Sequence, residues 1–98
     1  MSIATLTCED FAAQLGTVFL LQGAEGTTMP LTLAEANPGP GAAYAGRAPF
    51  SLIFRSAAQQ VVPQGFYRLE HPVMGPLEIT FAPVARTAAG IDYEAVFN

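Results

Sequence analysis

The sequence predicts a mainly β protein, a single small antiparallel barrel or roll of about six strands with one short N-terminal α-helix. Apolar and polar residues alternate with a period of two through most of the chain after position 16, as in half-buried strands. Turns rich in glycine and proline separate the alternating segments and leave no room for the crossover helices that parallel strands need. An antiparallel sheet curled around one core and plugged by the helix would bury the apolar positions in one domain, 1–98.

The helix is expected between Thr7 and Gly16. Thr7 suits the N-cap, and Asp10 occupies the third helical position, where its carboxylate completes a variant of the capping box. Gly16 stands where a left-handed residue commonly ends a helix. Phe11 and Leu15 are expected to form one apolar stripe that packs on the sheet, because so short a helix is not stable alone.

Six later segments are expected to be strands. Phe50, Leu52 and Phe54 should face the core, while Ile53 on the same strand faces outward and suggests that both faces are partly covered. The fourth and fifth segments are close enough in sequence to form an antiparallel hairpin. The six segments are Thr17–Leu21, Thr28–Ala36, Phe50–Arg55, Phe66–His71, Leu77–Phe81 and Ile91–Phe97.

Composition excludes several classes of protein. Apolar residues make up 51% of the 98 residues and charged residues 12%, against roughly 25% charged in a typical soluble domain. Such a chain is too apolar for intrinsic disorder. The 4 basic residues are all arginine and face 8 carboxylates, for a net charge of −4, which argues against nucleic-acid binding. With 1 cysteine, an internal disulfide or a thiolate zinc site is not available.

No targeting signal is visible in the sequence. No apolar run approaches the roughly 20 residues of a membrane helix, so membrane insertion is not expected. Glu9 and Asp10 lie near the N-terminus, where a signal peptide would carry basic residues. The default expectation is the cytoplasm, with later assembly into an extracellular or tail-like structure left open.

The residues that could carry chemistry have better structural interpretations, so no catalytic residue, metal or cofactor is expected. His71 is the 1 histidine of the chain, and its neighbour Glu70 points to the opposite strand face. The imidazole is expected to bond to the backbone of the following turn. The acidic residues that follow Cys8 oppose a reactive thiolate. Ser51 and Ser56 lie in no nucleophile elbow.

The absence of lysine points to an interaction protein, because lysine commonly protects exposed strand edges from pairing. Either the sheet closes, or its edges and apolar surface bind a partner or copies of the same chain. The last strand is expected to offer its end for edge pairing. On the outer face, Arg68 and Glu78 are expected to form a cross-strand pair. The candidate interaction surface comprises Tyr44, Arg47, Ile53, Val96 and Asn98.

Several motifs resemble the bacterial domain of unknown function 6916 family. They are PQGFYRLEHP at 63–72, PFSLIFR at 49–55 and YEAVFN at 93–98, with GTVF at 16–19 near the start. The likeness spans nearly the whole chain. The family has no assigned activity, and its members are often encoded beside phage tail-collar (microcystin-dependent-like) proteins, which build fibre-like structures. The resemblance therefore implies a tail-collar-type partner because of this gene neighbourhood, and not because any residue has a matching binding chemistry.

Two functions from different classes follow as expectations. The first is a non-enzymatic structural or assembly protein that forms a homo-oligomer or binds a tail-collar-type fibre protein through strand edges and apolar surface. The alternative is a barrel that binds a small molecule or peptide, with Tyr44 and Arg47 at a mouth formed by Asn37–Pro49. An interior filled by large aromatic side chains would remove this alternative. An enzyme that uses Glu70 and His71 is the third and weakest interpretation.

Overall fold

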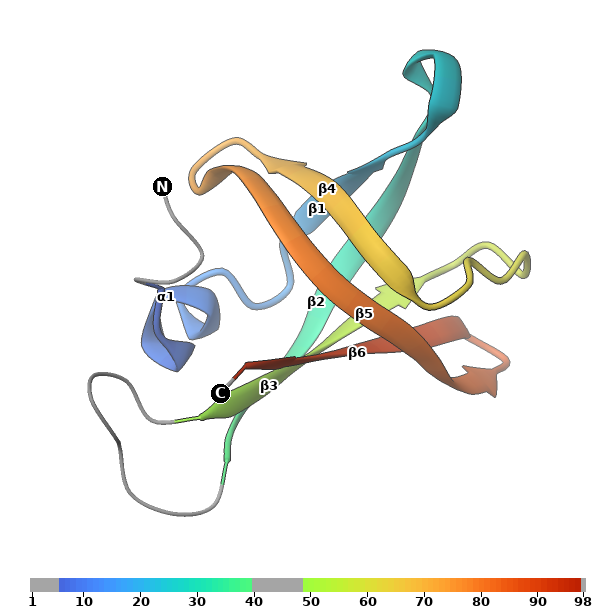
Figure 1. The fold of residues 1–98 in the computed structure, drawn as a ribbon. Coiled ribbons are helices and arrows are strands. Elements are labelled where there is room, and N and C mark those ends of the chain that lie inside the picture. Colours follow the sequence, from blue (N-terminus) through green and yellow to red (C-terminus); the bar gives the residue numbers. More distant parts are fainter. Residues whose placement is uncertain (1–5, 40–48, 98) are drawn as a thin grey trace.

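The computed structural model describes residues 6–39 and 49–97. Its strands form a closed antiparallel barrel in the order β1-β2-β3-β6-β5-β4, with one short helix (Figure 1). This confirms the predicted fold class. The elements are α1 (Cys8–Ala12), β1 (Val18–Gln22), the 3-10 turn η2 (Ala24–Gly26), β2 (Thr28–Pro38), β3 (Phe50–Ser56), β4 (Gly65–His71), β5 (Gly75–Thr87) and β6 (Gly90–Phe97).

A bend in β5 lets the sheet close. Residues Gly75–Phe81 pair with β4, as the predicted hairpin requires, and Ala82–Thr87 pair with β6. The strand passes from one neighbour to the other between Phe81 and Ala82, and its register with β6 shifts soon after, between Pro83 and Ala85. Such a bulge bends a strand and increases its twist, and proline suits it because it donates no ladder hydrogen bond.

Aromatic side chains fill the barrel interior. The inward positions of β3 are all buried, which confirms the alternation expected there. The ring of Phe54 lies 5.3 Å from that of Phe19 and 6.5 Å from that of Phe81, measured between ring centroids. Phe81 also contacts Tyr93 at 5.2 Å and Tyr67 at 4.9 Å. These contacts link side chains from β1, β3, β4, β5 and β6 into one core.

The helix begins where predicted but is shorter than expected. The capping box is present, since the Thr7 N–H donates to Asp10 Oδ2 at 2.8 Å and the Asp10 N–H donates to Thr7 Oγ1 at 3.3 Å. After Ala12 the chain continues as turns, and Gly16 has the left-handed conformation expected of it, with φ of 82°. The prediction for Leu15 was wrong. Leu15 lies beyond the end of the helix, so it is exposed and is not part of the apolar stripe.

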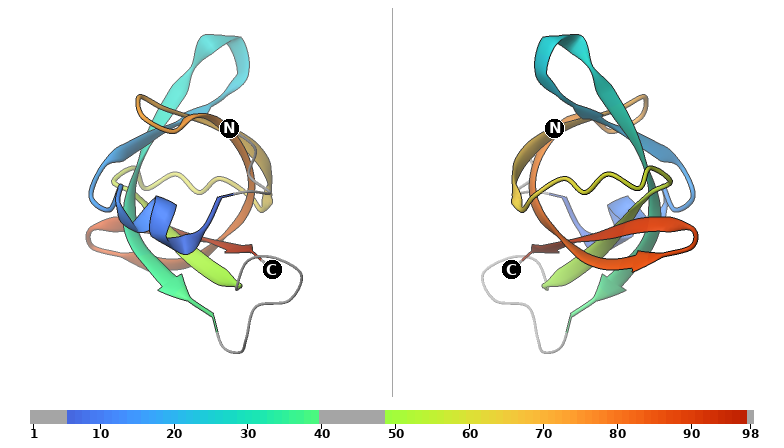
Figure 2. Two further views of the ribbon diagram at one scale, coloured as in Figure 1. Left: turned by 90° about the vertical axis from the view of Figure 1, so that its left-hand side faces the viewer. Right: turned by 90° about the vertical axis from the view of Figure 1, so that its right-hand side faces the viewer.

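The helix covers one end of the barrel through Phe11. Viewed along the barrel, α1 lies across one mouth (Figure 2). The buried ring of Phe11 lies 5.9 Å from Phe50 and 5.8 Å from Phe97, and these two rings stack at 4.6 Å. The helix therefore acts as the plug that the sequence predicts, held by one aromatic side chain.

Closure places β6 between β3 and β5. Residues Ile91–Phe97 pair with β3, and β5 covers much of the other side of the strand. The pairing of β6 with β5 spans Gly90–Glu94 and stops before the last residues of the strand, so the availability of its end for edge pairing stays a prediction. The shortest contact between neighbouring strands is the one between β1 and β4, which pairs Leu20 with Glu70 and Leu21 with Leu69. In the described ranges, no helix has the length and apolar character needed to cross a membrane.

Candidate functional site

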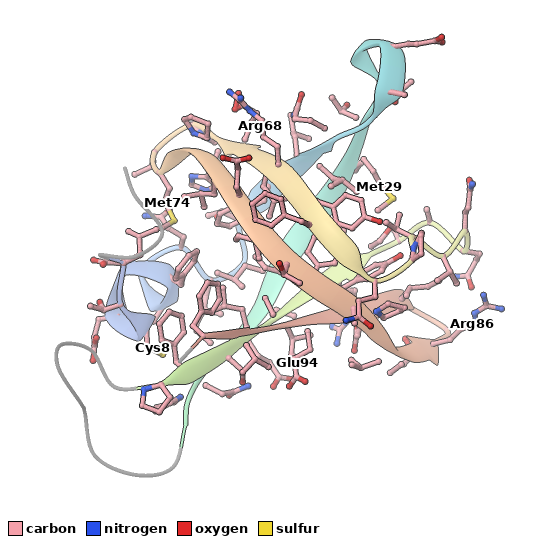
Figure 3. All side chains as sticks on the ribbon, in the orientation of Figure 1. Cys8, Met29, Arg68, Met74, Arg86 and Glu94 are labelled. Carbon is pink, nitrogen blue, oxygen red and sulfur yellow. The ribbon has the colours of Figure 1, made fainter. Side chains whose placement is uncertain are left out.

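The predicted interaction residues fall partly on the outer wall of β3 and β6. Ile53 is half-buried and lies opposite Glu94, whereas Val96 is 62% exposed and lies opposite Ser51. Val96 and Glu94 line an open hollow of about 400 Å³ at the end of these two strands. Figure 3 shows Glu94 pointing away from the barrel. The other three candidates, Tyr44, Arg47 and Asn98, lie outside the described residues.

A second hollow, of about 430 Å³, lies where β1 meets the turn between β4 and β5. The strand register places Leu20, Glu70 and Pro76 in one row across the outer wall. Val18 and Pro72 complete the apolar lining. We call this hollow the Glu70 groove. The sequence analysis did not predict this groove. The apolar run Val18–Leu21 was a signal for it, because apolar and polar residues alternate in a strand whose outer face is polar.

The Glu70 carboxylate is incompletely paired. Its Oε1 lies 3.7 Å from Nη2 of Arg68, on the same strand, while Oε2 is buried without a hydrogen-bond partner in the described structure. The register does place Arg68 opposite Glu78, as expected, but the ion pair of Arg68 is formed with Glu70 instead. An exposed pair at this distance contributes about 0–1 kcal/mol. The groove thus combines apolar walls with a partly exposed carboxylate whose one ion pair is long.

His71, next along β4, has both ring nitrogens engaged inside the protein. Nδ1 accepts hydrogen bonds from the backbone N–H groups of Val73 and Met74, each at 3.1 Å. Nε2 lies 2.9 Å from Oγ1 of Thr17, whose hydroxyl donates to the carbonyl of Gln14 at 2.7 Å. This network assigns the proton to Nε2. The expected bonds between the imidazole and the turn backbone are confirmed.

The surroundings of His71 favour the neutral imidazole. The side chain is buried, and its ring lies 4.2 Å from the ring of Phe19. Burial lowers the pKa of His71 from its ordinary value of 6.5. In the folded state described here, neither ring nitrogen has a free lone pair directed at the groove. The two hydrogen bonds that Nδ1 accepts hold the β4–β5 turn in place.

The other candidate nucleophiles also have structural surroundings. Burial, followed by the nearby charge of Glu9, raises the pKa of the Cys8 thiol, which disfavours the reactive thiolate. Ser56 is buried, and its Oγ accepts a hydrogen bond from the N–H of Ala58 at 3.1 Å. No group of three or more potential metal ligands occurs in residues 6–39 and 49–97.

Comparison with known proteins places the chain in a family. Residues 6–97 match the family described as Domain of unknown function (DUF6916). The chain belongs to this family. The match to DUF6916 extends from the residue before the helix cap to the end of β6, so both hollows lie within the family domain. No similar protein was found among curated proteins, and no similar structure among solved structures.

Proposed function

We propose that this domain is a non-enzymatic structural or assembly protein that binds copies of itself or a phage tail-collar-type fibre protein. The observation that carries the proposal is the number of large apolar side chains on the outer surface. Exposed apolar residues of this size, where they gather, mark surfaces that other proteins cover. They are Leu15, Val18, Leu20, Val61, Phe66, Val73, Val84 and Val96.

The strand positions of these residues strengthen the argument. The outer face of an antiparallel barrel normally carries polar side chains. Here two of the three outward positions of β1 are the apolar Val18 and Leu20, while Phe66 on β4 is 66% exposed. Val73, in the turn after β4, is 70% exposed. Burial of such side chains against a partner contributes about 25 cal/mol per Å² of apolar area.

We propose that the partner contacts exposed apolar side chains on the outer face of the barrel and does not pair with backbone groups at strand edges. The described strands close into a barrel, so edge pairing would be limited to short stretches, such as the end of β6 beyond its pairing with β5 at Gly90–Glu94. A closed barrel presents few free backbone donors and acceptors, so a partner gains mainly from apolar contact. The family that the sequence resembles suggests the kind of partner, because its members are often encoded beside tail-collar proteins.

The interior argues against the small-molecule alternative. Phe50, Phe54 and Phe81 are all buried and fill the space that a ligand would need. Most of the expected mouth lies outside the described residues. An enzyme receives no support from the buried, fully bonded His71.

The proposal is tested by light scattering of the purified domain and by co-purification with a co-expressed tail-collar protein. We expect a defined oligomer or a stable complex. A variant that combines Val18→Thr, Phe66→Thr and Val96→Thr should weaken that association, and Thr28→Ser, exposed on β2 opposite Gln22, serves as the matched control. A wild-type domain that stays monomeric and binds no tail-collar protein would contradict the proposed function.

A further inference from the structure

The Glu70 groove has the chemistry of a site for a guanidinium group. The Glu70 side chain, which is 40% exposed, lines the groove with a carboxylate, and apolar side chains from β1 and the two flanking prolines form the walls. A guanidinium is planar and weakly hydrated, so its faces pack on apolar walls while its edge donates hydrogen bonds to a carboxylate. An ammonium, which is compact and strongly hydrated, fits such a groove less well.

A complementary group lies at the other end of the barrel. Arg86 is near the end of β5 and projects away from the molecule (Figure 3). Arg55 and Arg68 each have a carboxylate within ion-pair distance, but among the described groups Arg86 contacts only the carbonyl of Gln59, at 3.5 Å. Val84, two residues before it, is exposed. Arg86 and Val84 together form a surface that is both basic and apolar, which we call the tip.

The groove and the tip cannot meet within one copy. Pro76, in the row that contains Glu70, begins β5, whereas Arg86 ends it. Ten extended residues span about 30 Å, which is comparable with the 38 Å longest extent of the molecule. Any contact between these two surfaces therefore joins different copies.

We propose that copies of the domain assemble head to tail, with Arg86 of one copy bound in the Glu70 groove of the next. This inference rests on the proposed function and names a second copy as the partner. The two contact surfaces differ, so the interface is heterologous and repeats into a ring or a filament. The net charge of −4 makes copies repel one another overall, so a specific pairing of opposite charges would select this orientation.

Charge reversal tests the contact. Sedimentation velocity would be measured over a concentration series for the wild type, Glu70→Arg and Arg86→Glu. Each single variant should raise the dissociation constant by about tenfold or more. An equimolar mixture of the two variants should associate again, since Arg86 of the first then meets Glu70 of the second. Glu35→Arg, on β2 and outside the groove, is the matched control and should behave like the wild type.

The outcomes separate this inference from the proposed function. Single variants that associate as strongly as the wild type, or a mixture that stays apart, would overturn the head-to-tail contact. A wild type that remains monomeric would overturn it too, while co-purification with a tail-collar protein would still support the proposed function. Thermal melts of each variant check that the barrel is folded. Association that returns in the mixture is a second check, because misfolded variants would not restore it.

Discussion

His71 makes the stability of the barrel depend on pH. In the folded state Nδ1 accepts two backbone N–H bonds, so it can take a proton only if both bonds break. Burial lowers the pKa of His71 below 6.5 in the folded state. The unfolded chain therefore binds a proton more readily, and the stabilisation is fully present above about pH 6.5. It is lost as the pH falls below that value towards the lower, folded pKa.

We expect the free energy of unfolding to fall between about pH 8 and about pH 5.5, by about 1.4 kcal/mol at most, because pH 5.5 lies about one unit below the unfolded pKa of 6.5. Urea titrations at the two pH values measure it. His71→Asn retains an acceptor for the turn and removes the titration, so its stability should change little over the same range. Equal pH dependence in the variant and the wild type would show that His71 is not the group responsible.

Gly90 is required by a close backbone approach. It lies at the turn between β5 and β6 with φ of 135°, and a Cβ there would lie 1.8 Å from the carbonyl oxygen of Ser56. Gly90→Ala should therefore cost several kcal/mol or prevent folding. Gly26 also has a positive φ, but its Cβ would meet nothing within 4 Å. Gly26→Ala should cost about 1 kcal/mol, and chemical denaturation of the two variants gives the comparison.

At the scale of elements, α1 contributes mainly through one side chain. Phe11 is fully buried between Phe50 and Phe97, so Phe11→Ala should destabilise the domain by about 3–5 kcal/mol. Thr7→Ala, which removes the cap, should cost about 1 kcal/mol. Thermal or urea unfolding measures both. A small effect of Phe11→Ala would mean that the helix is not needed to close the barrel.

Local patterns predicted the elements well and their pairing less well. The capping box at Thr7 and the turn at Gly16 depend on neighbouring residues, and both are present as expected. Leu15 was misplaced because the helix changes to turns after Ala12, and no nearby residue signals that change. The Glu70 groove depends on the register that brings Leu20 opposite Glu70, which closure of the whole barrel sets.

At the scale of the whole molecule, chain order and sheet order differ. The last strand of the chain is not the last strand of the sheet, since β6 pairs with β3 along Ile91–Phe97 and with β5 along Gly90–Glu94. Closure pairs each described strand with two neighbours and leaves exposed apolar side chains, among them Val18, Leu20 and Phe66, as the surface through which we propose that a partner binds. The alternation of β3 predicted which of its residues are inside, but no local pattern reveals which strands are neighbours.

A dilution series followed by residue-resolved amide NMR tests the central claim most directly, because it shows which surface responds when copies meet. We expect concentration-dependent shifts at outward residues such as Val18, Leu20 and Phe66, with the inward Phe54 and Tyr93 unchanged. Adding a tail-collar protein should perturb the same wall. Spectra that stay the same at every concentration and in the presence of that protein would contradict the account.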